Sequence, residues 1–141
     1  MKDLRKNLVK NALDWERAFG NAPAITSAVS ELDAAVLIGC SQEEYSEIMQ
    51  GITAVQKGHD FVYKGLRYQV KANRPSGKRG SKVTLVPKAK NYEWDFLIWV
   101  LYSREYEIEE AWLWPVVEYR NSFHAINRLS PAHYRQGKKL A

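Results

Sequence analysis

Asp60, Gln69 and Lys71 are spaced so that a carboxylate, an amide and an ammonium group can meet on one predicted β-hairpin. Lys64-Gly65 is the predicted turn, because Gly at the second turn position suits the positive φ that tight hairpin turns require. Counting outward from this turn sets Asp60 opposite Gln69, with Lys71 diagonal to both, and directly opposed residues share a face of the sheet. Carboxylate and amide oxygens are ligands of hard cations such as Mg²⁺, and a nearby ammonium group can offset negative charge that develops on a phosphate.

The second strand of this hairpin, residues 66–73, alternates strictly between apolar and polar side chains. This alternation is typical of a strand with one buried face. The apolar set is Leu66, Tyr68, Val70 and Ala72. The polar set is Arg67, Gln69, Lys71 and Asn73. A solvated strand face can carry such residues by chance, but Asp, Gln and Lys together in register favour a functional site.

The order of Asp, a short hairpin and then Gln-x-Lys resembles the motif of the PD-(D/E)XK superfamily, the restriction-endonuclease-like nucleases, over residues 24–115. Gln69-Val70-Lys71 is similar to the Gln-x-Lys variant of Mrr-type nucleases. Two positions depart from the commoner pattern. His59 stands where many members have Pro, and Gln69 replaces a charged ligand, which lowers the negative charge of the site.

The resemblance implies an α/β fold with a restriction-endonuclease-like core, in which helices flank a central mixed sheet of about five strands. The catalytic residues that it implies are Asp60, Gln69, Lys71 and Glu31. The ligands that it implies for Mg²⁺, or for Mn²⁺, are Asp60, Gln69, Glu31 and the backbone carbonyl of Val70. A Lys close to two carboxylates is expected to stay protonated. Lys71 would therefore stabilise charge on the phosphate, with less weight on a role as the base.

Two helices are predicted before residue 40. Residues 3–19 have apolar side chains at steps of three and four, which is typical of an amphipathic helix. This helix either packs on the core or serves as a dimer arm. Pro23 fits the first turn of a second helix that runs to Ile38. Glu31 lies near its middle, either as a surface carboxylate or, by the resemblance, beside the metal.

A capping box, Ser41–Glu44, predicts the start of a third helix, which Gly51 ends. A short strand is then expected to begin at Ile52, Ala54 or Val55. Cys40 is predicted to be a small core residue, and a single Cys excludes an intramolecular disulfide. With three scattered His, a structural zinc site is not expected.

Residues 74–82 contain one Pro, two Gly and four basic side chains, so regular structure is not expected there. This loop follows the strand that carries Lys71. Its small residues leave room for a close approach to phosphates, so the loop is either a clamp on the DNA backbone or a solvated flexible segment. The residues predicted to contact DNA are Arg67, Asn73, Arg74, Lys78, Arg79 and Lys82.

Two further strands are predicted at residues 95–102 and 106–114. The first is almost entirely apolar, which fits a strand buried on both faces. Pro115 stops the second, and its Trp112 and Trp114 are more often core or interface aromatics than platforms for base stacking. Ser130-Pro131 is predicted to start a helix in a basic tail that either contacts phosphates or frays.

The length of 141 residues predicts one domain. Its parts are a helical segment (1–50), a sheet with the site (52–115) and a helical, basic tail (116–141). The net charge of +5 and the pI near 9.3 favour a polyanionic partner. No apolar run approaches the roughly 20 residues that cross a bilayer, and the N-terminus lacks the apolar centre of a signal peptide. A cytoplasmic protein without membrane contact is therefore expected.

Three functions agree with this pattern. The first is a metal-dependent endonuclease that hydrolyses phosphodiester bonds in double-stranded DNA. A homodimer or a higher homo-oligomer is expected, because a double-strand cut usually requires two sites. The second is a catalytically inactive nuclease-fold module that binds DNA or a protein, which Gln69 favours. The third is a protein-interaction domain that uses the Trp-rich strands and has no affinity for DNA.

Overall fold

The sheet at the centre of the molecule has five strands in a computed structural model that describes residues 3–52, 58–76 and 79–141. The strands are β1 (Phe61–Tyr63), β2 (Leu66–Asn73), β3 (Phe96–Tyr102), β4 (Ile108–Pro115) and β5 (Lys138–Lys139). They lie side by side in chain order, and β2 and β3 are parallel while the other pairs are antiparallel. The predicted α/β class with a mixed sheet is therefore confirmed.

The hairpin between β1 and β2 has the predicted turn and register. Lys64 and Gly65 have φ values of 50° and 79°, and positive φ at both central residues matches the twist of the flanking strands. Phe61 pairs with Tyr68, and Tyr63 pairs with Leu66. The counting argument from the turn is thus confirmed over all of β1.

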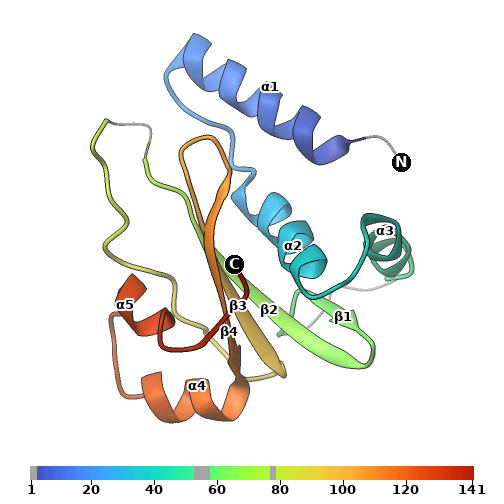
Figure 1. The fold of residues 1–141 in the computed structure, drawn as a ribbon, viewed down its shortest axis with the longest axis vertical. Coiled ribbons are helices and arrows are strands. Elements are labelled where there is room, and N and C mark those ends of the chain that lie inside the picture. The colour runs from blue at the N-terminus through green and yellow to red at the C-terminus, as the bar shows by residue number, and fades with distance from the viewer. Residues whose placement is uncertain (1–2, 53–57, 77–78) are drawn as a thin grey trace.

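Helices cover both faces of the sheet (Figure 1). On one face lie α1 (Leu4–Phe19), α2 (Thr26–Leu37) and α3 (Gln42–Gln50). On the other lie α4 (Val116–Phe123) and α5 (Pro131–Tyr134). Each face has its own cluster of buried apolar side chains. The sheet is the common wall of both clusters, and β3 is buried on both faces as predicted.

The helix boundaries follow the predicted caps in most places. The Asp3 carboxylate accepts the Lys6 N–H at the start of α1 (3.0 Å), and the capping box that starts α3 is present. The predicted start of α2 at Pro23 is wrong, because a turn in which the Ile25 N–H donates to the Pro23 carbonyl comes first (3.0 Å). Cys40 is buried, as expected.

Two strand predictions need correction. The strand predicted from residue 106 begins at Ile108, because Tyr106 has φ 62° and its N–H donates to the Ser103 carbonyl in the preceding turn (3.1 Å). Ile52 lies in no strand, and the other expected strand starts, Ala54 and Val55, fall outside the described residues. The fifth strand is β5, which the tail adds against β4.

The tail packs against the sheet and does not fray. Its Tyr134 is buried, and the Trp114 indole N–H donates to the Tyr134 carbonyl (3.0 Å). Ser130 precedes α5, which starts at Pro131 as predicted. Trp114 is therefore a core residue, and Trp112 is a partly buried side chain packed at the edge of the same cluster. In the described part of the chain, no helix is both long enough and apolar enough to cross a membrane.

Candidate active site

A cavity of about 340 Å³ lies between α2 and β2. Its walls contain all five residues that were expected to hold a metal or to act in catalysis: Glu31, Asp60, Gln69, Val70 and Lys71. The remaining lining residues are Thr26, Ser27, Ser30, Ala72 and Pro87. The β1–β2 hairpin and α2, which are distant in the chain, therefore meet at this cavity.

The position of this cavity follows from the unequal lengths of β1 and β2. β1 pairs only with the first three residues of β2, so the later part of β2 extends past it. Asp60 comes directly before β1, and its backbone N–H donates to the Tyr68 carbonyl (2.8 Å). Its carboxylate Oδ2 accepts the Val70 N–H (2.7 Å). A side chain thus takes the hydrogen bond that a longer β1 would have made, and this bond fixes the Asp60 carboxylate in the cavity wall.

Glu31 and Asp60 form a crowded carboxyl pair. The pKa of Glu31 is raised to about 8, first by burial and then by the negative charge of Asp60 and a hydrogen bond with it. Burial, followed by the negative charges of the nearby Glu31 and Asp60, raises the pKa of Tyr45 to about 12. Two carboxyl groups that are close enough to share a hydrogen bond favour a proton or a cation between them.

Lys71 lies in a partly buried environment beside the pair. Its pKa is lowered from 10.5, because burial outweighs the attraction of Asp60 and because Lys90 adds positive charge nearby. The attraction of Asp60 acts in the expected direction, but desolvation has the larger effect on the pKa of Lys71. That Lys71 stays protonated remains a prediction. A cation that is poorly hydrated is attracted more strongly to an anionic phosphate than one in bulk water.

Three residues that were predicted to contact DNA already bind other parts of the chain. Arg67 pairs with Asp95 through its guanidinium (3.2 Å) and its backbone N–H (2.8 Å). Arg74 is 9% exposed in its side chain and pairs with Glu16 (3.0 Å). The Asn73 amide N–H₂ donates to the backbone of the following loop, and its oxygen accepts the indole N–H of a β3 tryptophan. A phosphate contact by Arg74 would require its ion pair to open.

The other three predicted DNA contacts lie in the basic loop. Arg79 and Lys82 are exposed, which leaves them accessible to a polyanion. Lys78 falls outside the described residues.

Lys90 was missed as a site residue. It is exposed, and its charge acts on Lys71. Its segment is held by two tyrosines, since the Tyr134 hydroxyl donates to the Pro87 carbonyl (2.5 Å) and the Ala89 N–H donates to the Tyr119 hydroxyl (2.9 Å). The sequence offered only the basic character of residues 88–90 as a signal, because the segment reaches the cavity through contacts that are distant in the chain.

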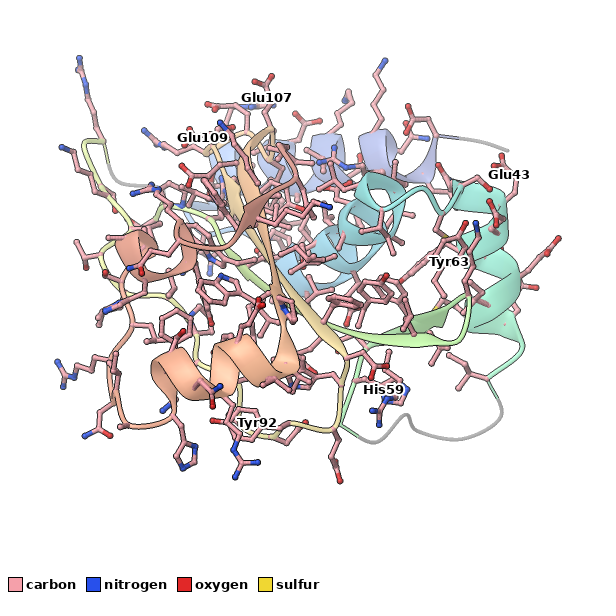
Figure 2. The ribbon with its side chains drawn as sticks, turned by 60° about the horizontal axis from the view of Figure 1, so that its bottom comes forward. Glu43, His59, Tyr63, Tyr92, Glu107 and Glu109 are labelled. Carbon is pink, nitrogen blue, oxygen red and sulfur yellow. The ribbon has the colours of Figure 1, made fainter. Side chains whose placement is uncertain are left out.

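The donor atoms of the cavity fit a hard divalent cation. Glu31, Asp60 and the Gln69 amide offer oxygen ligands, which Mg²⁺ and Mn²⁺ prefer. Burial and the charge of Asp60 raise the pKa of Glu31, and a cation between the two carboxyls would offset this repulsion. Within the described ranges, no group of three or more His, Cys, Asp and Glu residues is placed to hold a metal. Glu107 and Glu109 lie at the opposite end of the molecule from His59, the neighbour of Asp60 (Figure 2).

A scan against protein-family models and a search of curated proteins both find no match to this chain. The cavity and the motif that its residues form are therefore the features that bear on function.

Proposed function

We propose that this protein is a metal-dependent endonuclease that hydrolyses phosphodiester bonds in double-stranded DNA. The observation that carries the proposal is the single cavity shared by Glu31, Asp60, Gln69 and Lys71. The reaction adds water to the phosphorus and breaks one P–O bond, which leaves a phosphate monoester and a hydroxyl group.

Each residue has a stated role in this proposal. Glu31, Asp60, Gln69 and the carbonyl of Val70 hold Mg²⁺ or Mn²⁺, which when bound polarises the scissile phosphate and acidifies a water molecule. The Val70 N–H keeps the Asp60 carboxylate in one orientation. Lys71 offsets the negative charge that grows on the phosphate oxygens during attack.

The substrate class follows from charge and from the resemblance of the motif. The net charge is +5, and the exposed Arg79, Lys82 and Lys90 are cations that can contact the phosphate backbone on either side of the scissile bond. The preference for double-stranded DNA over RNA comes from the family that the motif resembles. A homodimer with two cavities would cut both strands.

The test is cleavage of supercoiled, linear, methylated and branched DNA with Mg²⁺ and with Mn²⁺. Wild-type protein should cleave at least one of these substrates, and EDTA should stop the reaction. Lys71→Ala should lower the rate by roughly 10²-fold or more, while circular dichroism shows an unchanged fold. Lys64→Ala is the matched control, because Lys64 is an exposed lysine at the turn of the same hairpin. Equal rates for wild type and Lys71→Ala would refute the proposal.

A second candidate function is a nuclease-fold module that binds DNA and does not cut it. Gln69 favours it, because an amide in place of a carboxylate leaves two acidic ligands in the cavity, Glu31 and Asp60. Such a module would bind DNA with an affinity that falls steeply with salt and does not depend on Mg²⁺. Salt-dependent binding with no metal-dependent cleavage of any substrate would establish this second function in place of the first.

A further inference from the structure

α1 carries an apolar stripe on its outer side. The stripe consists of Leu4, Leu8, Trp15 and Phe19, which are 59%, 41%, 53% and 67% exposed. At 3.6 residues per turn these four positions fall within about 60° of one another around the helix axis. Trp15 and Phe19 also pack on each other with ring centroids 4.7 Å apart. The four side chains therefore form one continuous exposed surface.

This stripe is not the face by which α1 packs on its own domain. That face buries Val9 and Ala12 in the core. Near the start of the helix, Arg5 pairs with Asp33 on α2 (2.7 Å), and near its end Glu16 pairs with Arg74 after β2 (3.0 Å). The helix is thus fixed on one side and has a second apolar side without cover among the described residues.

The four positions of the stripe are symmetric about the midpoint of the helix. Leu4 and Phe19 are equally far from the midpoint between residues 11 and 12, and so are Leu8 and Trp15. A two-fold axis through that midpoint would set Leu4 against Phe19 of a second copy, and Leu8 against Trp15. An isologous interface requires this kind of self-complementary pattern. Each pairing joins a leucine to an aromatic ring, so two bulky rings do not compete for one space.

The charges of α1 permit two copies to approach. Lys10 and Arg17 both pair with Asp14 on the same helix, and these pairs lower the pKa of Asp14. Arg5 and Glu16 are paired with other elements. At 3.6 residues per turn, Lys10 and Arg17 lie on the side of α1 opposite the stripe, so their charges stay away from the proposed contact.

We propose that α1 is an antiparallel dimerisation helix that binds α1 of a second copy of this chain. The 16 residues of α1 give a helix about 24 Å long and about 10 Å wide, which covers only several hundred Å² on each copy. This lies below the roughly 800 Å² per subunit of a standard interface. The dimer is accordingly weak, dissociates on dilution and depends on its aromatic residues, as small interfaces do.

Sedimentation velocity over protein concentrations from about 1 to about 200 μM tests the proposal, because this range spans a micromolar dissociation constant. The wild-type mass should rise from 16.3 kDa towards twice that value. Trp15→Glu should stay monomeric throughout. Val117→Glu is the matched control, since Val117 is an apolar residue of α4 that is 65% exposed on the other face of the molecule. A monomeric wild type, a dimeric Trp15→Glu or a monomeric Val117→Glu would each refute the interface.

A disulfide tests the antiparallel arrangement without disturbing the stripe. Asn11 is exposed beside the proposed two-fold axis, so Asn11→Cys should form a covalent dimer under mild oxidation. Lys64→Cys should not, and wild type with its buried Cys40 is the blank. If Asn11→Cys fails to crosslink, the antiparallel pairing is wrong. Neither experiment contains DNA or metal, so these results are independent of the proposed nuclease function.

Discussion

Glu31 and Asp33 lie two residues apart on α2. Both are at least partly buried, but the groups that surround them have opposite effects on a negative charge. Both oxygens of Asp33 accept hydrogen bonds from Arg5, at 2.7 and 2.8 Å, and Oδ2 also accepts the Tyr102 hydroxyl (2.6 Å). Glu31 instead faces another carboxylate, that of Asp60. One acidic group is surrounded by donors, and its neighbour is set against a like charge.

The surroundings of Asp33 stabilise the fold. Its hydrogen bond raises the pKa of Arg5 against the effect of burial, and burial followed by the charge of Asp33 raises the pKa of Tyr102. These contacts join α1, α2 and β3, which are far apart in the chain. A buried charge that lacks hydrogen-bond partners destabilises the folded state. A buried charge with all its hydrogen bonds made favours one arrangement of the elements that it joins.

The surroundings of Glu31 do not stabilise its charge. Burial and a like charge both disfavour its ionised form, and burial also lowers the pKa of Lys71 in the same cavity. Groups whose pKa values are displaced by burial and by a specific charged neighbour cluster at functional sites. Asp33 is therefore a carboxylate whose contacts stabilise the fold, whereas we propose that Glu31 binds a ligand.

Glu31→Gln should break the proposed function and leave the fold intact. We expect DNA cleavage to fall roughly 10²-fold or more, because a neutral amide binds a hard cation less well than a carboxylate. At and above about pH 8, where Glu31 ionises in the folded protein, the free energy of unfolding should increase, because the like charge beside Asp60 is removed. Cleavage assays and urea denaturation measure the two effects on one preparation. Retained activity in Glu31→Gln would remove Glu31 from the proposed site.

Asp33→Asn should have the opposite pattern. Arg5 and Tyr102 would keep their donors and lose the charge that they surround, so we expect a loss of roughly 2–3 kcal/mol in unfolding free energy. This is less than for a fully buried pair, because the Arg5 side chain is partly exposed and screened by water. Asp14→Asn, on the exposed side of α1, is the control and should leave the free energy of unfolding close to that of wild type. Equal stability of Asp33→Asn and wild type would show that the buried ion pair does not hold α1.

The hairpin could be predicted from sequence because its determinants are local. The turn residues Lys64 and Gly65 set the register, and the alternation along β2 sets the faces. The meeting of Asp60, Gln69 and Lys71 therefore followed from counting. Glu31 was reached only through the resemblance, because nothing local tells which face of α2 lies over β2.

The misses have non-local causes. Arg74 looked like a DNA contact because it opens a basic loop, but its ion-pair partner Glu16 lies 58 residues earlier in the chain. Lys90 was overlooked because tyrosines of the tail position its segment. The pairing of β5 with β4 was not predicted for the same reason, since strand pairing at a sheet edge depends on which segment reaches that edge.

The pH dependence of stability offers a finer test of the comparison. In the metal-free protein the pKa of Glu31 is raised from 4.5 to about 8. A carboxyl group with a raised pKa supports folding fully below its unfolded value, and this contribution is lost as pH rises to the folded value. Wild type should therefore lose stability between about pH 4.5 and 8 relative to Glu31→Gln. Because Glu31 is only half-buried, solvent screening reduces the expected difference to about 1–2 kcal/mol.

Urea denaturation of both proteins at several pH values in EDTA measures this difference. Glu43→Gln is the matched control, since Glu43 is exposed on α3 near the N-terminal end of α1 (Figure 2), and it should follow the wild-type curve. Added Mg²⁺ should recover stability in wild type at pH 8 more than in Glu31→Gln, because ligand binding to the folded state stabilises it. Parallel curves for wild type and Glu31→Gln would mean that Glu31 and Asp60 do not crowd each other, and the distinction between the two carboxylates of α2 would be lost.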